Sequence, residues 1–154
     1  MKNNSKIFFF ILLLIFFFCL KSLSAELKKF MSLKNNKVYL RQGPSFEYPV
    51  KLIYKKKYLP VEIIDRSETW RKIKDFEKNS GWIHISQLSR KKSALNIKNN
   101  SILYKKPTIF SKPIAKIEKG KLVLIKKCKI KWCNIKSNEF NGWIIKDFLW
   151  GKIN

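Results

Sequence analysis

Several residue types that enzymes depend on are scarce in this chain. Its 154 residues include one histidine (His84), ten acidic residues and five glycines. A Ser, Thr or Cys nucleophile needs a neighbouring base, usually a histidine, and the glycines form no phosphate-binding loop. The nearest carboxylate pairs, Asp65 with Glu68 and Asp75 with Glu77, are interpreted as solvated turn charges. We therefore predict a protein that is not an enzyme and carries neither a metal nor another cofactor.

Long apolar runs are absent except near the amino terminus. Ile7–Leu20 is a run of 14 apolar residues, preceded by two lysines and followed by the small residues of Ser22–Ala25. This order is typical of a secretory signal peptide, and 14 residues fall short of the roughly 20 that a spanning helix needs. We predict a signal peptide over residues 1–25 and a periplasmic or secreted protein. The alternative is an uncleaved segment that anchors the protein to the membrane.

Acidic residues are too few to balance the basic ones. The formal net charge is +24, and +21 remains when the three lysines of residues 1–25 are removed. Such a surface attracts anionic partners in a salt-dependent way. However, 30 of the 34 basic residues are lysine, a bias that an AT-rich genome also produces. Both interpretations stay open. Nucleic acid is not expected as a partner, because the export signal points to another compartment.

Helical periodicity is missing after the signal segment, and an internal repeat is present instead. The segment Val61–Leu88 recurs, less strongly, as Val123–Leu149. The repeat is marked by two tryptophan pairs, 62 and 61 residues apart, namely Trp70 with Trp132 and Trp82 with Trp143. A repeat of this kind indicates two copies of one unit. Short alternating strands separated by turn signals predict an all-β fold with a small barrel or sandwich in each copy.

The repeat also sets the expected domain boundaries. We predict a first domain over residues 26–89, a linker over residues 90–100 and a second domain over residues 101–154. The linker, RKKSALNIKNN, is largely polar, although Ala94–Ile97 would also suit a strand.

Two cysteines, Cys128 and Cys133, follow the signal segment. An even number of cysteines in an exported chain favours a disulfide. Their spacing places them at the end of one strand and the start of the next, facing each other across a four-residue hairpin loop at a suitable Cα separation. The first copy has Arg66 and Arg71 at these positions. We predict a disulfide in the second copy alone.

Three sequence motifs resemble a known family. They are VYLRQGPSFEYPV at residues 38–50, the hairpin with W-x-x-I, and GWIHISQL at residues 81–88. Together they resemble the bacterial SH3-like (SH3b) domain and, more narrowly, a tandem form found in exported bacterial proteins of uncharacterised function. The resemblance covers about Val38 to Trp150 and implies two tandem, small, half-open barrels without enzymatic activity. In the second copy Tyr104–Pro107 replaces Arg41–Pro44, so a different loop is expected there.

Strand alternation divides the first copy into a core face and an outer face. Ile83 and Ile85 share one face of a strand and are predicted core residues, which turns Trp82 and His84 outward. Trp70 faces outward in its own strand by the same argument.

Outward aromatic residues on a small barrel are a candidate ligand platform. The predicted platform consists of Arg41, Tyr48, Trp70, Trp82 and His84, with Trp132 and Trp143 as the equivalents in the second copy. We expect an exported, non-catalytic module that binds cell-envelope material, either peptidoglycan or an envelope peptide or protein. The alternative is a structural or assembly protein of the envelope whose tryptophans pack internally. Nonspecific binding of the lysines to anionic surfaces is a further expected interaction.

Overall fold

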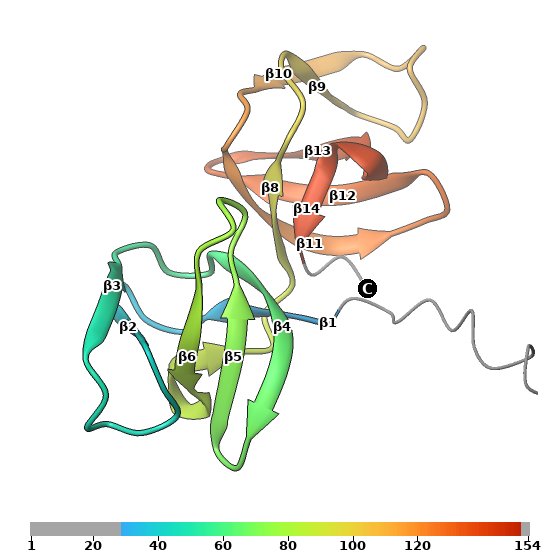
Figure 1. Ribbon diagram of the computed structural model, residues 1–154. Helices are drawn as coiled ribbons and strands as arrows, with labels where there is room; N and C mark the ends of the chain where they lie inside the picture. Colours follow the sequence, from blue (N-terminus) through green and yellow to red (C-terminus); the bar gives the residue numbers. More distant parts are fainter. Residues whose placement is uncertain (1–28, 152–154) are drawn as a thin grey trace, which may run out of the picture.

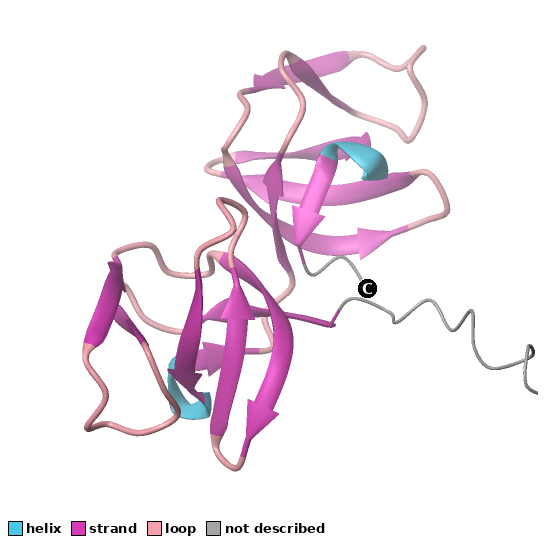
Figure 2. Ribbon diagram, in the orientation of Figure 1, coloured by secondary structure: helices cyan, strands magenta, loops and turns pink. Residues whose placement is uncertain are grey.

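The computed structural model describes residues 29–151, so the predicted signal peptide lies outside the described residues. Fourteen strands and two short 3₁₀ turns make up the secondary structure of this part of the chain. The strands form two antiparallel seven-stranded sheets, one after the other in sequence (Figures 1 and 2). The all-β, two-copy architecture is thus confirmed. Within residues 29–151 the helical turns are too short to span a bilayer.

The two sheets have the same topology. The first has the order β3-β2-β6-β5-β4-β1-β7, and the second has the order β10-β9-β13-β12-β11-β8-β14. The strands of the first sheet are β1 (Lys29–Leu33), β2 (Val38–Arg41), β3 (Val50–Tyr54), β4 (Pro60–Ser67), β5 (Trp70–Lys74), β6 (Ser80–His84) and β7 (Leu88–Ser89). Those of the second are β8 (Ser93–Asn96), β9 (Ser101–Tyr104), β10 (Pro113–Ile117), β11 (Leu122–Cys128), β12 (Trp132–Ser137), β13 (Phe140–Ile145) and β14 (Leu149–Gly151). Each copy has one 3₁₀ turn before its last strand, η1 (Ile85–Gln87) or η2 (Lys146–Phe148).

Each copy needs a glycine where two strands approach closely. A Cβ at Gly81 in β6 would lie 2.6 Å from the carbonyl oxygen of Arg41 in β2. A Cβ at Gly142 in β13 would lie 2.7 Å from the carbonyl oxygen of Tyr104 in β9. Any larger residue would push the two strands apart. This close approach explains why the repeated tryptophan is preceded by glycine in both copies.

Alternating strand residues supply one hydrophobic core per copy. The first core includes Leu33, Val38, Leu40, Val61, Ile73 and Ile83. The second core includes Leu103, Val123, Ile125, Cys133, Ile135 and Ile144. The prediction that Ile85 belongs to the core is wrong, because β6 ends at His84 and Ile85 begins η1 with 39% of its surface exposed. The alternation stops where the chain turns.

Strand β8 lies inside the segment predicted as a linker. It pairs with β11 through Ala94 opposite Val123 and with β14 through Leu95 opposite Trp150. The second sheet therefore begins at Ser93, and residues 90–92 connect it to β7. The polar composition of this segment suggests an exposed linker, yet Asn96 is fully buried. Its side-chain amide donates hydrogen bonds to backbone carbonyl oxygens, and a buried polar group generally needs such partners.

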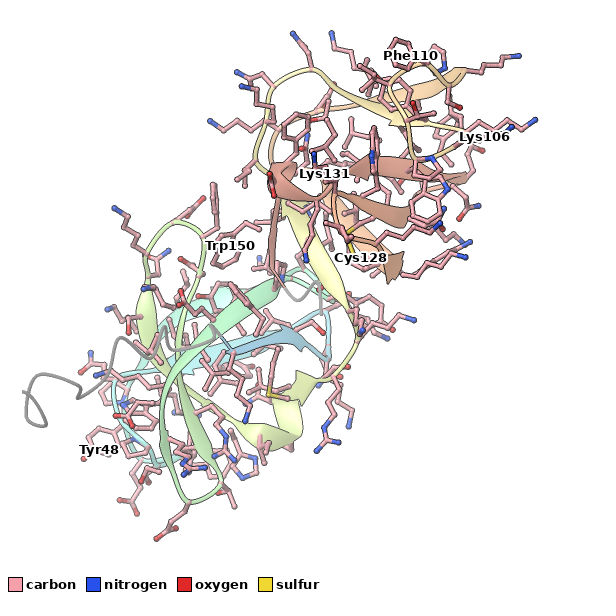
Figure 3. The ribbon with its side chains drawn as sticks, turned by 90° about the vertical axis from the view of Figure 1, so that its right-hand side faces the viewer. Tyr48, Lys106, Phe110, Cys128, Lys131 and Trp150 are labelled. Atoms are coloured by element: carbon pink, nitrogen blue, oxygen red, sulfur yellow. A yellow bond between two sulfur atoms is a disulfide. The ribbon has the colours of Figure 1, made fainter. Side chains whose placement is uncertain are left out.

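The predicted disulfide joins Cys128 to Cys133. The two cysteines are opposite each other in the β11–β12 ladder, with their Cα atoms 4.0 Å apart. Figure 3 shows this bond in the second copy, at Cys128. It closes the hairpin of residues 129–132. In the first copy, Arg66 and Arg71 are the corresponding partners.

The two copies contact each other through Trp150 of β14. Its ring centroid lies 5.0 Å from that of Phe30 in β1 and 5.5 Å from that of Phe76 in the β5–β6 loop, both in edge-to-face geometry. Figure 3 shows Trp150 at the junction of the two copies. Ser89 is its equivalent in the first copy, because both residues follow the leucine that begins the last strand. Trp150 was not among the predicted site residues.

Candidate ligand-binding surface of the first repeat

Four of the five residues predicted for the platform lie on one outer face of the first sheet. Trp70 in β5 is opposite His84 in β6. Trp82 in β6 is opposite Arg41 in β2. Side chains two residues apart on a strand share a face, and so do directly opposed residues on neighbouring strands. The fifth residue, Tyr48, comes from the loop of residues 42–49 that joins β2 to β3.

Phe46, from the same loop, folds back over this face. Its ring centroid lies 4.9 Å from that of Trp70 and 5.3 Å from that of His84, and the latter two rings are 5.3 Å apart. Phe46 is 62% exposed, whereas Trp70 is 6% exposed. Trp70 therefore lies outside the barrel core but beneath a loop side chain. Phe46 was not predicted, since strand alternation does not reveal which loop residue folds back.

Arg41 and Tyr48 hold this loop in place. Nη1 of Arg41 donates a hydrogen bond to the backbone carbonyl of Tyr48 at 2.7 Å, and the guanidinium carbon lies 5.7 Å from the centre of the Phe46 ring. The ring of Tyr48 packs on Gly43, where a Cβ would lie 2.6 Å from the ring atoms. Nε of Arg41 is buried without a hydrogen-bond partner. An unsatisfied buried donor is costly, so a ligand acceptor that reached it would be favoured.

His84 has a local structural role on this face. Its Nδ1 accepts a hydrogen bond from the backbone N–H of Ser86 at 3.4 Å and lies 2.7 Å from the Ser86 hydroxyl oxygen. These contacts cap η1. They also fix the imidazole ring against the edge of Trp70. The histidine is therefore held in position by groups of the protein before any ligand arrives.

The equivalent tryptophans of the second repeat have different surroundings. Trp132 makes an edge-to-face contact with Tyr104 at 5.7 Å. Trp143 is 9% exposed and lies beneath the ammonium groups of Lys127 and Lys129, at 5.7 and 5.5 Å from the ring centroid. Its aromatic face is therefore occupied by lysines of the same repeat.

The second repeat also lacks the polar residues of the first surface. Tyr104 is opposite Trp143 where Arg41 is opposite Trp82. Ile145 is opposite Trp132 where His84 is opposite Trp70. The residues gathered on the first repeat thus have no full counterpart on the second.

A cleft between the two repeats was not predicted. It encloses about 610 Å³ and is lined by apolar residues of both repeats and by three lysines, among them Leu52, Tyr54, Leu59, Phe76, Leu95, Lys55, Lys56 and Lys119. Its residues are far apart in the sequence, so no local pattern identifies it.

Asp75, in the wall of this cleft, is buried, and the interpretation of its carboxylate as a solvated turn charge is wrong. The residue is 6% exposed. Its carboxylate accepts hydrogen bonds from the Tyr54 hydroxyl at 3.0 Å and from the backbone and side-chain N–H groups of Asn79 at 2.8 and 2.9 Å. Burial raises the pKa of the Tyr54 phenol well above its ordinary value, and the neighbouring charge of Asp75 raises it further. Tyr54 therefore remains a hydrogen-bond donor to Asp75.

Among residues 29–151, no group of three or more His, Cys, Asp or Glu side chains is placed to hold a metal ion.

A comparison of the sequence with known families identifies both repeats. Residues 34–90 and residues 98–151 each match the family described as bacterial SH3 domain. The chain belongs to the bacterial SH3 domain family. Each repeat is one SH3 domain, which confirms the resemblance drawn from the loop motif and the Gly-Trp pair. A comparison with curated proteins gave no match.

Three solved structures are similar to this tandem of SH3 domains. NlpC2 from Trichomonas vaginalis is 15% identical with a TM-score of 0.38, and the match covers 84% of this chain and 50% of that one. NlpC1 from the same organism is 15% identical with a TM-score of 0.37, with coverage of 85% and 48%. An NlpC/P60 family protein from Bacillus cereus ATCC 10987 is 11% identical with a TM-score of 0.36, with coverage of 79% and 56%. The chain spans about half the length of these proteins.

Proposed function

We propose that this protein is an exported, non-catalytic module that binds cell-envelope material, either peptidoglycan or a peptide of an envelope protein. One observation carries the proposal. Arg41, Tyr48, Trp82 and His84 lie together with Phe46 on the outer face of the first SH3 domain. Bacterial SH3 domains are typically binding modules, often in exported or envelope-associated proteins, which fits the periplasmic or secreted location predicted from residues 1–25.

The surface combines apolar faces with one polar group, Nε of Arg41, that has no hydrogen-bond partner within the described part of the protein. Phe46 and Tyr48 are 62% and 47% exposed, and Trp82, opposite Arg41, is half-buried. The buried Nε–H of Arg41 can donate a hydrogen bond to an acceptor atom of a ligand. Sugar rings and peptides both present apolar faces beside carbonyl or hydroxyl oxygens, and ligand sites characteristically pair aromatic walls with a few polar groups. In this proposal Phe46 makes the first contact, and its displacement would uncover Trp70.

A structural role in envelope assembly is the second candidate, and the internal packing of three tryptophans favours it. Trp70 and Trp143 are 6% and 9% exposed, and Trp150 packs between the two domains. In that case the tryptophans stabilise the tandem, no small ligand binds, and the partner is another envelope protein.

Co-sedimentation with purified peptidoglycan sacculi at several salt concentrations tests the first candidate. The informative variant is Trp82→Ala, which removes a half-buried ring from the proposed surface. Trp132→Ala is the matched control, because it removes a half-buried tryptophan from the outer face of the second domain. Thermal unfolding of both variants, followed by circular dichroism, shows whether the fold is kept.

We expect wild-type binding that persists at high salt, a loss of about tenfold in affinity for Trp82→Ala, in keeping with a central aromatic contact, and little change for Trp132→Ala. Binding that disappears at modest salt for all three proteins would indicate attraction of the lysines alone. Retention of salt-resistant binding by Trp82→Ala would place the ligand elsewhere. Absence of binding to sacculi, together with capture of an envelope protein, would favour the assembly role.

A further inference from the structure

Two loop tips of the second SH3 domain leave large apolar side chains in solvent. Phe110, in the loop of residues 105–112 between β9 and β10, is 93% exposed, and its neighbour Ile109 is 57% exposed. Ile130, in the disulfide-closed hairpin between β11 and β12, is 91% exposed. Single exposed apolar residues are common on proteins, so the inference depends on what surrounds these three and on how the first domain differs.

The first domain has acidic residues at the same two tips. Its loop of residues 42–49 is closed by a bond from the N–H of Gln42 to the carbonyl of Pro49 at 3.1 Å, and the second loop by the corresponding bond from Lys105 to Lys112 at 3.0 Å. The expectation that the second loop differs is therefore wrong for its length and closure. It holds only for the side chains.

This equivalence aligns Glu47 with Phe110. In both residues the backbone N–H donates a hydrogen bond to the hydroxyl of the residue two positions earlier, Ser45 or Thr108. Glu68 likewise aligns with Ile130. Arg66 pairs with Arg71 in the first hairpin as Cys128 pairs with Cys133 in the second, and Glu68 and Ile130 each lie two residues after the first member of that pair. The acidic residues Glu47 and Glu68 are thus replaced by apolar residues in the second domain, whereas the exposed Phe46 of the first loop corresponds to the exposed Ile109.

Lysines flank the two apolar tips in the sequence, namely Lys105, Lys106, Lys112, Lys127, Lys129 and Lys131. All six are exposed, and none of them forms an ion pair with a carboxylate of the described chain. The ammonium groups of Lys127 and Lys129 also lie over the ring of Trp143. In Figure 1 the β9–β10 loop and the β11–β12 hairpin project on the same side of the second domain, and Figure 3 views that side, with Phe110, Lys106 and Lys131 labelled. The two tips form one face, here called the tip face. It consists of the six lysines together with Ile109, Phe110 and Ile130.

We propose that the tip face docks on an anionic phospholipid bilayer. Phe110, Ile109 and Ile130 insert among the headgroups, and the lysines pair with the lipid phosphates. Apolar side chains beside clustered lysines provide the two contributions, burial and charge attraction, that bind proteins to membrane interfaces. An anionic polysaccharide would engage the lysines, but its sugar rings offer only narrow apolar faces and no apolar interior into which Phe110 and Ile130 could insert. The tip face is separate from the surface of the first domain, so this proposal does not depend on the proposed function.

The test is co-sedimentation of the full chain with vesicles of phosphatidylcholine, alone or mixed with equal parts of phosphatidylglycerol. The variant Phe110→Glu/Ile130→Glu gives the second domain the acidic tips of the first, at positions too exposed to affect the fold. Its matched control is Phe140→Glu, a 41% exposed residue of the same domain that begins β13, at the opposite end of β12 from the tip hairpin. A second variant, Lys129→Gln/Lys131→Gln, removes two lysines of the tip face. Its matched control is Lys119→Gln/Lys121→Gln, whose residues lie in the β10–β11 turn at the opposite end of β11.

We expect wild-type binding to the mixed vesicles to fall about tenfold or more for Phe110→Glu/Ile130→Glu and about fivefold for each tip lysine removed, with little change in either control. Residues 1–25 are common to every variant, so their contribution cancels in each comparison. Equal binding by the wild type and Phe110→Glu/Ile130→Glu would overturn the proposal, because the loss of two apolar side chains and the gain of two negative charges at the contact face must weaken binding to an anionic bilayer. Equal losses in the tip variants and their controls would overturn it as well, because the binding would not be localised to the tip face.

Discussion

The packing of Trp150 between Phe30 and Phe76 makes a quantitative prediction about how the two SH3 domains stabilise each other. The substitution Trp150→Ser gives the second domain the residue that the first has at the equivalent position, Ser89. It removes two edge-to-face ring pairs, with centroid distances of 5.0 and 5.5 Å. Each such pair contributes about 0.5–1.5 kcal/mol beyond burial, and the burial of the half-buried indole contributes about 1–2 kcal/mol more. We expect a total loss of about 2–5 kcal/mol.

Calorimetry and urea unfolding measure this loss. A unit of about 60 residues is marginally stable alone, so we expect the wild type to unfold in one cooperative transition and Trp150→Ser to unfold in two. Trp132→Ala is the matched control, because its ring contacts Tyr104 inside the second domain. It should lower stability without separating the transitions. A single transition for Trp150→Ser, within about 0.5 kcal/mol of the wild type, would refute the coupling of the domains through Trp150.

Three further predictions concern the fold. Replacing Cys128 and Cys133 by serine removes a short cross-link and should lower the free energy of unfolding by about 2 kcal/mol; unchanged urea unfolding would contradict this. Gly81→Ala places a Cβ 2.6 Å from the Arg41 carbonyl oxygen and should lower the free energy of unfolding by about 3 kcal/mol. Gly120→Ala, where no atom lies within 4 Å of the new Cβ, should lower it only by the roughly 1 kcal/mol of a left-handed backbone. Equal losses of stability in the two variants would exclude steric contact as the cause. The raised pKa of Tyr54 means that the folded protein holds this proton more tightly than the unfolded chain does, so this stabilisation is complete below about pH 10 and lost as the pH rises further, by at most about 1.4 kcal/mol per unit. Tyr54→Phe should lack this part of the alkaline slope, and parallel curves for the two proteins would show that Tyr54 does not titrate as described.

Those features that follow from local patterns could be predicted from the sequence. The two copies, the all-β fold and the hairpin disulfide depend on alternation, turn residues and spacing within single segments. The outward direction of Trp82 and His84 also followed from alternation along one strand, and they lie on the face predicted for them.

The features that depend on contacts between distant segments could not be predicted. Phe46 folds over Trp70 from a loop, and Trp150 joins two domains, yet neither position has a periodic signal. Ala94–Ile97 was recognised as suitable for a strand, but the polar sequence around it left the strand undecided, because the burial of Asn96 depends on hydrogen bonds to segments more than 20 residues away. Asp75 was read as a solvated charge for the same reason, since its partner Tyr54 is 21 residues away.

The direct test of ligand binding by the first domain is a titration of the protein with soluble peptidoglycan fragments, followed through the indole N–H resonances of its five tryptophans. The proposed surface predicts that the Trp82 and Trp70 signals shift and saturate at high salt, because one borders the ligand and the other is uncovered by Phe46. The Trp132 and Trp143 signals should stay in place. Unchanged Trp82 and Trp70 signals, or equal shifts of all five that vanish as salt is added, would contradict a ligand site on the first domain.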